Sequence, residues 1–438
     1  MTEGLSRYIF LLRDRCPVCG LGAWKEKKMR LVLAVFFTLL FLPCLATAQI
    51  LLPPATSPIK KIPIAVAVLK AKGDLSIYGK NFTNVLKNDL TNAALFDVRP
   101  ASILFSSSFE DIDFEYLDAQ KTKYLVSGNF GVSPREVLYE LIVYDVPGRR
   151  ELMRRRYMTS PHHIRNVVHK FAGEIMRELT GLDGFFDSEI VFVRGRGHGK
   201  DLFIMDYDGH NAKKLTNHGS SVLSPDCSPD GSQVVFTSDK SWDHDVYLLN
   251  FKATPLPAEG RRVTRGIHLD NSPRWSPDGA RVAFSRNGDI YIASPSGEIL
   301  KRLTKSPAID LSPTWSPDGK KIAFVSDRAG APNIYVISPE GGSAKRITSG
   351  GYNTDPVWSP SASVNRIAFV KVRKSEADIY AVGPDGRGEQ RLTASGRNEH
   401  PSWSPDGHYI TFSSKKLGKR QIYIMYLNGE NKLPLSKS

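Results

Sequence analysis

A five-residue phrase, Trp-Ser-Pro-Asp-Gly, recurs in the second half of the chain and constrains the fold more than any other feature. Intact copies stand at 275–279, 315–319 and 403–407. In one altered copy Cys227 takes the tryptophan position, and in the other, which begins at Trp358, a longer segment replaces Asp-Gly. From Cys227 to Trp403 the chain covers 176 residues in four steps, a mean period of 44. Such a period indicates a propeller or a solenoid.

The residues of the phrase distinguish these two architectures. Proline suits the second position of a type I turn, aspartate tolerates the third, and glycine supplies the positive φ of a bulged hairpin loop. The phrase is followed by short runs such as 281–285 and 289–293, which are apolar nearly throughout, as expected for a sheet covered on both faces. Because this turn chemistry joins strands, a helical solenoid is excluded.

Counting the outer strands sets the number of blades. Third strands are expected at 201–206, 245–250, 289–293, 333–338, 378–382 and 421–426, and fourth strands are expected to end near Thr216, Thr264, Thr304, Thr348, Thr393 and Ser436. Six of each predict a six-bladed β-propeller. Only five inner strands are evident, so we expect residues 184–186, Gly-Phe-Phe, to supply the sixth, unless the ring is incompletely closed.

The first 48 residues are typical of a secretory signal region. A basic stretch at 25–30 precedes an apolar run of fifteen residues, 31–45, and an Ala-Thr-Ala site, which predicts secretion with cleavage between Ala48 and Gln49. The run is short for a membrane span, which needs about 20 residues. Residues 1–28 precede a natural first residue at Met29 and are interpreted as an over-called start. Cys16, Cys19 and Cys44 fall in this region, which leaves the mature chain Cys227 and no disulfide.

The remaining chain predicts a multidomain protein, in which a small α/β N-terminal domain is followed by an all-β six-bladed β-propeller. Residues 49–61 contain three prolines and are expected to form a flexible arm. Residues 62–183 carry about five strands and two main helices, the first capped by Asp74 and the second running from Ser160 to Gly181. The propeller then occupies 184–438.

The order of these features resembles the TolB family of the Tol-Pal envelope system. The resemblance covers the signal region, Ile64 to Val68 with its helix, 123–129, Glu178 to Gly181, 190–193 and the repeats. It implies a non-enzymatic scaffold in the periplasm that binds the peptidoglycan-associated lipoprotein at the propeller mouth. It also implies contact with an inner-membrane Tol component through the arm or the α/β domain, and a role in outer-membrane integrity and cell division. The family commonly ends with a further Trp-Ser segment, which this chain lacks.

Charge and motifs weigh against other functions. The net charge is +14, and part of it lies at Arg149, Arg150 and 154–156, which we interpret as a solvated strand face rather than a nucleic-acid site. The sequence 341–345 fails the Gly-x-Ser-x-Gly pattern of a serine hydrolase at its fifth position. His162 and His163 are neighbours at the start of a helix and point apart, so they do not chelate a metal.

The segments that precede the inner strands are the expected binding site, because they gather around one mouth of the channel. This predicted partner-binding set is His218, His268, Asp270, Asp310, Asn353, Asp355, Asn398, Glu399 and His400. Such acidic and amide side chains suit a basic or polar segment of a protein, or a hydrated Ca²⁺ ion in the channel. The alternative function is a periplasmic metal-dependent lactonase or hydrolase, which needs three or four ligands deep in the channel. No such cluster is evident, so the scaffold is favoured and no cofactor is expected.

Overall fold

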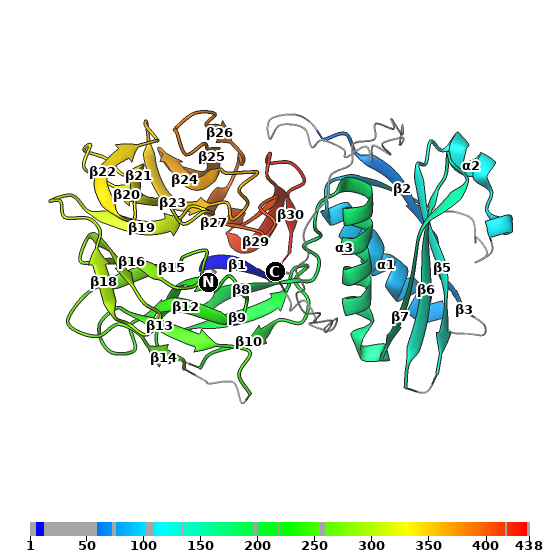
Figure 1. Cartoon of the computed structure of the whole chain (residues 1–438), viewed down its shortest axis with the longest axis horizontal. Helices are drawn as coiled ribbons and strands as arrows, with labels where there is room; N and C mark the ends of the chain where they lie inside the picture. Colours follow the sequence, from blue (N-terminus) through cyan, green and yellow to red (C-terminus); the bar gives the residue numbers. More distant parts are fainter. Residues whose placement is uncertain are drawn as a thin grey trace, which may run out of the picture.

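The structure is a computed structural model of the chain that describes residues 6–12, 59–71, 76–100, 109–133, 135–196, 199–217, 219–254, 259–416 and 418–435. A propeller lies beside a smaller α/β domain, as Figure 1 shows. The propeller has six four-stranded blades, and one parallel pair, Ala377 with Arg397, joins blades 5 and 6 into a single sheet. The fold class predicted from the sequence is therefore confirmed, and the blade number is six. Asp74, the expected cap of the first helix, lies outside the described residues.

The blades follow one another along the chain, each with its first strand innermost. Blade 1 contains β1 (Ser6–Leu12), β8 (Ser188–Arg196), β9 (Gly199–Asp206) and β10 (Lys213–Lys214); blade 2 contains β11 (Val222–Cys227), β12 (Gln233–Ser238), β13 (Asp245–Asn250) and β14 (Arg261–Arg262); blade 3 contains β15 (Asp270–Trp275), β16 (Val282–Arg286), β17 (Asp289–Ala293) and β18 (Ile299–Arg302). Blade 4 contains β19 (Asp310–Trp315), β20 (Ile322–Ser326), β21 (Asn333–Ser338) and β22 (Gly341–Arg346); blade 5 contains β23 (Tyr352–Trp358), β24 (Ile367–Arg373), β25 (Glu376–Val382) and β26 (Gln390–Arg391); blade 6 contains β27 (Arg397–Trp403), β28 (Tyr409–Lys416), β29 (Lys419–Tyr426) and β30 (Leu433–Pro434).

The recurring phrase forms the hairpin between the first and second strands, and its hydrogen bonds explain its residues. In the blade 3 copy the Ser276 hydroxyl donates to Asp278, while the Arg281 backbone N–H donates to Ser276 Oγ at 2.9 Å. The glycine, Gly279, adopts a φ of +68°, and the glycines of the other Asp-Gly copies have φ between +67° and +75°. Each phrase therefore closes its own hairpin.

The sixth inner strand is not where we expected it. Residues 184–186 form no strand, and β1 instead pairs antiparallel with β8, with Tyr8 opposite Phe192 and Leu12 opposite Ser188. Strand β1 contacts both β11 and β27, which completes the ring of first strands. The prediction for 184–186 was therefore wrong: the ring is closed by a segment that lies far from blade 1 in the sequence. This segment belongs to residues 1–28, which were interpreted from the sequence as an over-called start, so this closure requires a chain that contains 6–12.

The α/β domain is a mixed sheet in the order β4-β2-β5-β6-β7, with β3 beside β5. Its elements are β2 (Ile62–Val66), β3 (Lys70–Ala71), α1 (Ser76–Asn92), β4 (Phe96–Pro100), the 3-10 turn η1 (Phe109–Asp111), α2 (Phe114–Ala119), β5 (Tyr124–Val132), β6 (Val137–Asp145), β7 (Arg150–Thr159), the 3-10 turn η2 (Pro161–His163) and α3 (Ile164–Thr180). Strands β2 and β4 pair parallel around α1, as the strand-helix-strand pattern predicted. Helix α3 ends at Gly181, which has a left-handed φ of 74°.

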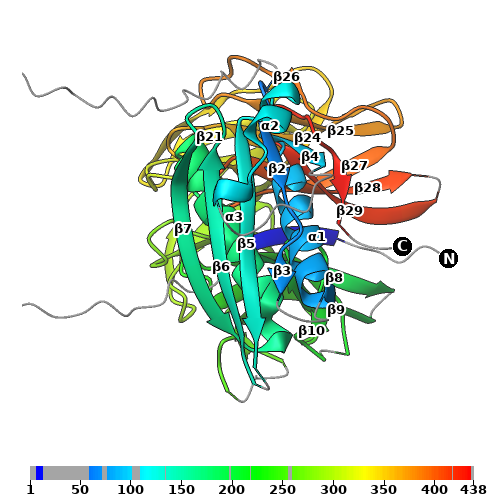
Figure 2. The same cartoon turned by 90° about the vertical axis from the view of Figure 1, so that its right-hand side faces the viewer.

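Helices α1 and α3 lie between the sheet and the propeller, and α2 covers the opposite face of the sheet (Figures 1 and 2). One continuous apolar core joins Phe82 of α1 and Phe171 of α3 to Tyr409 of blade 6. Phe185 packs against Tyr409, with ring centroids 3.9 Å apart and the rings tilted by 36°. The residues expected to close the ring thus fill the domain junction instead. Among the described residues, no helix is long and apolar enough to cross a membrane.

Candidate functional site

The two ends of the propeller channel differ. At one end, called the rim below, the inner strands begin and the predicted partner-binding set lies. At the other end the phrases line a cavity of about 430 Å³, with Cys227, Trp275, Trp315, Trp358 and Trp403 around it. Cys227 is partly buried and burial raises the pKa of its thiol, which agrees with a packing role in a tryptophan position.

Each inner strand of blades 2 to 6 carries one bulged residue in the same place. The ladder to the second strand shifts register there, and the residue adopts a φ between 49° and 56° immediately before a proline. These five bulge residues, all half-buried, are Ser224, Ser272, Ser312, Asp355 and His400. A positive φ costs a residue other than glycine about 1–3 kcal/mol, and such strain concentrates at functional sites. The bulges therefore identify the rim half of the channel as a candidate site.

The predicted partner-binding set falls into several environments. His218 lies outside the described residues. His268 is half-buried beside Asn287, while Asn353 and Asn398 are buried, with Asn398 bonded to Asp378 at 3.0 Å. Asp355 and His400 are neighbouring bulge residues, and their side chains approach within 4.0 Å. Glu399 pairs with Arg420 at 2.8 Å and with Arg397 at 2.5 Å. Burial alone would raise the pKa of its carboxyl, but the two arginines outweigh the burial and lower that pKa.

Asp270 and Asp310 do not present carboxylates to the solvent. Both are 0% exposed, and each accepts two hydrogen bonds from one guanidinium, Asp270 from Arg286 at 2.7 Å and Asp310 from Arg328 at about 3 Å. The arginines cover the acids and remain 12% and 28% exposed. The acidic ring inferred from the sequence is therefore neutralised at these two blades, and a partner would meet guanidinium groups there.

Large apolar side chains surround the same end of the propeller. They follow the second strand of blade 2 or flank the starts of the inner strands of blades 3 to 5, and they are strongly exposed. This apolar crescent is Trp242 (98% exposed), Ile267 (90%), Leu269 (57%), Ile309 (53%), Leu311 (38%) and Tyr352 (53%). Exposed apolar groups gathered on one face are a mark of protein interaction sites.

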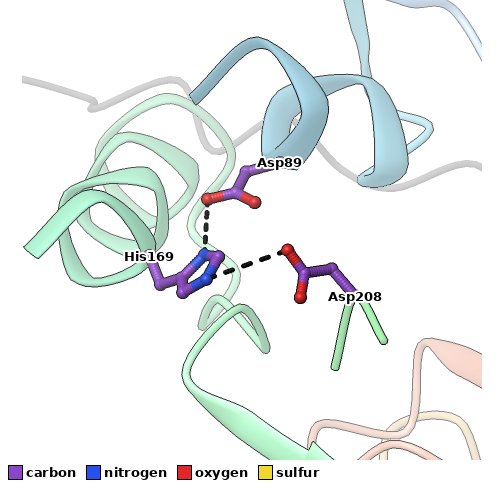
Figure 3. A group of neighbouring side chains, drawn as sticks. All are labelled: Asp89, His169 and Asp208. Atoms are coloured by element: carbon purple, nitrogen blue, oxygen red, sulfur yellow. Dashed lines mark hydrogen bonds and ion pairs between the residues drawn. The ribbon is translucent and has the colours of Figure 1, made fainter. Parts of the chain in front are cut away.

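A buried polar cluster joins the two domains, as Figure 3 shows. Asp89 of α1, which is 0% exposed, lies 2.8 Å through Oδ2 from His169 Nδ1 of α3 and accepts a hydrogen bond from the Tyr207 hydroxyl of blade 1 at 2.5 Å. On its other side, His169 Nε2 faces Asp208 Oδ2 at 4.0 Å. Burial raises the pKa of Asp89 in spite of these bonds.

Asp89, His169 and Asp208 are residue types that bind metal ions, but a guanidinium nitrogen already lies among their side chains. Arg165 Nη2 contacts Asp208 Oδ2 and lies 3.2 Å from His210 Nδ1 and 3.5 Å from His169 Nε2. Burial of Asp208 is outweighed by Arg165 and the two histidines, which lower the pKa of its carboxyl. The Arg165 guanidinium already lies within this cluster, and the cluster is at the domain junction rather than in the channel. It is therefore not the metal site deep in the channel that the hydrolase hypothesis requires.

The arginine-rich strand β7 is a salt-bridged surface. Arg154 and Arg156 pair with Glu140 at 3.1 Å and 2.8 Å, and Arg155 pairs with Glu174 at 2.5 Å. These contacts agree with the interpretation of this strand as a solvated face.

Comparison with known proteins decides the family. A model of the TolB beta propeller domain matches residues 176–438, and a model of the TolB amino-terminal domain matches residues 56–152. The chain belongs to the TolB family. Among solved structures, the crystal structure of TolB from Acinetobacter baumannii matches with a TM-score of 0.75 and 25% identity, covering 87% of this chain and 96% of that one.

Curated TolB relatives match over shorter lengths. The Tol-Pal system protein TolB of Desulfosudis oleivorans is 33% identical over 296 residues, which is 63% of this chain and 64% of the relative. That of Syntrophotalea carbinolica is 36% identical over 158 residues, which is 35% of this chain and 37% of the relative. The chain thus spans less than two thirds of the length of these two relatives.

The sequence analysis identified only some of the bulge residues at the rim. It identified Asp355 and His400, whereas Ser224, Ser272 and Ser312 share their bulge and their proline. The signal was present, because a residue followed by proline stands three positions before Cys227 and before each tryptophan of the phrases. No comparable sequence pattern predicts the apolar crescent, because the exposure of its side chains depends on how the blades are arranged.

Proposed function

We propose that this chain is a non-enzymatic protein-binding component of the Tol-Pal system that acts in the periplasm and binds the peptidoglycan-associated lipoprotein at the rim. The family supports a Tol-Pal role, because the matching relatives carry that name. The observation that carries the choice of surface is the apolar crescent, with Trp242 at 98% and Ile267 at 90% exposure. Tryptophan is enriched among the residues that dominate binding energy at protein interfaces.

Polar groups give this surface its specificity in the proposal. The bulge residues Asp355 and His400 and the arginines over Asp270 and Asp310 lie at the same end as the crescent. Because Asp270, Asp310 and Glu399 are already paired with arginines, we do not include a Ca²⁺ ion or another cofactor. The arm, 49–61, and the α/β domain remain the proposed contacts of the inner-membrane Tol component, a role in line with outer-membrane integrity and cell division.

The test is binding of purified lipoprotein to the double variant Trp242→Ser/Ile267→Ser. Both side chains are almost fully exposed, so the propeller should keep its stability while affinity falls about 30-fold, as expected for the loss of roughly 2 kcal/mol at a hot spot. Met158→Ser is the matched control, because Met158 is 66% exposed on the α/β domain. Affinity of the double variant within twofold of the original would refute the rim assignment. Substituting Asp270 and Asp310 is a poorer test, because it also breaks buried ion pairs.

A further inference from the structure

A pocket lined by four arginines lies on the side of the propeller, at the seam between blades 2 and 3. It has a volume of about 360 Å³, which suits a small ligand. Arg261 and Arg262 of β14 and the following Arg265 form one wall, and Arg286 of β16 and the turn around Ser296 form the other. Of the residues that line this pocket, the rim proposal uses only Arg286.

The seam that holds the pocket is built by close backbone contacts. Arg261 donates hydrogen bonds to the carbonyl oxygens of Pro295 at 2.8 Å and Ser296 at 3.3 Å. Gly297 has a φ of +105°, and a Cβ atom there would lie 2.2 Å from the Val263 carbonyl oxygen. The turn of blade 3 is therefore fixed against the edge of blade 2, so the pocket wall is formed before any ligand arrives.

The charges in the pocket are unequal. Arg262 pairs with Asp245 at 2.6 Å and Arg286 pairs with Asp270 at 2.7 Å, and both carboxylates are at least 99% buried. Arg261 bonds only to backbone carbonyls, and exposed Arg265 has no ion-pair or hydrogen-bond partner in the described part of the chain. Four guanidinium groups thus face two carboxylates, which leaves two positive charges without acidic partners.

We propose that this pocket binds a phosphate monoester. The planar guanidinium group presents paired N–H donors that match phosphate oxygens, and a phosphate monoester carries a charge of about −1.5 to −2 at neutral pH. Two uncompensated arginines match such a dianion better than a single carboxylate. The ester comes from a small soluble molecule or from a phospholipid headgroup, and both offer the same group to the pocket.

The test is calorimetric titration of the full chain with inorganic phosphate, and sedimentation with vesicles containing phosphatidic acid. We expect saturable phosphate binding at one site, about tenfold weaker in Arg265→Gln, because each lost bond to a charged group removes roughly 1.5 kcal/mol. Arg265 is chosen because its removal leaves the seam and both ion pairs intact. Arg387→Gln, whose side chain is 91% exposed elsewhere, is the charge-matched control and should bind as the original does.

Several results would overturn the proposal. They are no saturable phosphate binding by the folded chain, unchanged binding by Arg265→Gln, equal weakening by Arg387→Gln, or acetate binding as tightly as phosphate. Vesicle binding that depends on Arg265 supports the lipid headgroup as the source. Phosphate binding without vesicle binding supports the soluble ester.

Discussion

Two buried tyrosines offer a matched test of how the domains are held together. The Tyr207 hydroxyl donates to Asp89 across the domain junction, whereas the hydroxyl of Tyr139, inside the α/β domain, is buried without a partner in the described part of the chain. Both residues are 0% exposed. The Tyr207 hydroxyl also accepts a hydrogen bond from Asn92 Nδ2 at 3.4 Å. Replacing each tyrosine with phenylalanine removes the same atom from the same kind of environment, so the difference measures the two hydrogen bonds of Tyr207.

Tyr207→Phe should lower the free energy of unfolding by about 2 kcal/mol, because it takes a hydrogen-bond partner from buried Asp89, and leaving a buried polar group unsatisfied costs roughly 1–3 kcal/mol. Tyr139→Phe should be neutral or stabilising by up to about 1 kcal/mol, since it removes an unsatisfied polar atom. With a urea slope of about 3 kcal/mol per M, the Tyr207→Phe midpoint falls by roughly 0.7 M.

Urea unfolding should be followed with two probes. Tryptophan fluorescence reports the propeller, because all the tryptophans of the described residues lie there, and circular dichroism reports α1 and α3. In Tyr207→Phe we expect the two transitions to separate, because the weakened junction no longer couples the domains. Equal stability of the two variants would refute the role assigned to the Tyr207–Asp89 bond.

Three further predictions concern the propeller. Gly209→Ala should cost at least about 1 kcal/mol more than Gly388→Ala in urea unfolding, because both glycines have positive φ but only the first meets a carbonyl, that of Leu435 at 2.0 Å; equal losses would contradict this. The hydrogen bond from the Ser276 hydroxyl is the main cause that lowers the pKa of Asp278 in the folded state. This carboxylate therefore stabilises the fold at a pH above its unfolded pKa of about 3.9, and the stabilisation is lost as the pH falls through the lower pKa of the folded state. Ser276→Ala should therefore lose less stability on acidification than the original chain. An unchanged dependence of stability on pH would contradict the stabilising role assigned to the Asp278 carboxylate. Deleting 6–12 should speed hydrogen exchange of β8 amides, and unchanged protection there would show that β1 does not close the ring.

The sequence predicted the blades well because their signals are local. Third strands were placed within two residues of their observed bounds, since turn residues and apolar runs recur within each blade. Closure by β1 was missed because Tyr8 and its partner Phe192 lie far apart in the chain, and because residues 1–28 were interpreted as an over-called start. Local sequence patterns do not predict which strands pair when the partners are this far apart in the chain.

The sequence predicted where the candidate rim residues lie on the inner strands, but not which residues surround them. Asp270 and Asp310 start inner strands, as expected, but their covering arginines stand 16 and 18 residues further on, in or just beyond the next strand. The cluster of Asp89, His169 and Asp208 combines three elements from two domains, and His169 lies 80 residues from Asp89. Burial of a charge depends on such distant neighbours, which spacing alone does not reveal.

The bulged inner strands have a consequence for how this propeller can diversify. At Ser224, Ser272, Ser312, Asp355 and His400 the backbone departs from the ladder, and the same local geometry accommodates a hydroxyl, a carboxylate and an imidazole. Replacing one of these side chains leaves the pairing of its neighbours untouched. The channel entrance can therefore change its recognition chemistry one blade at a time while the architecture that carries it stays constant.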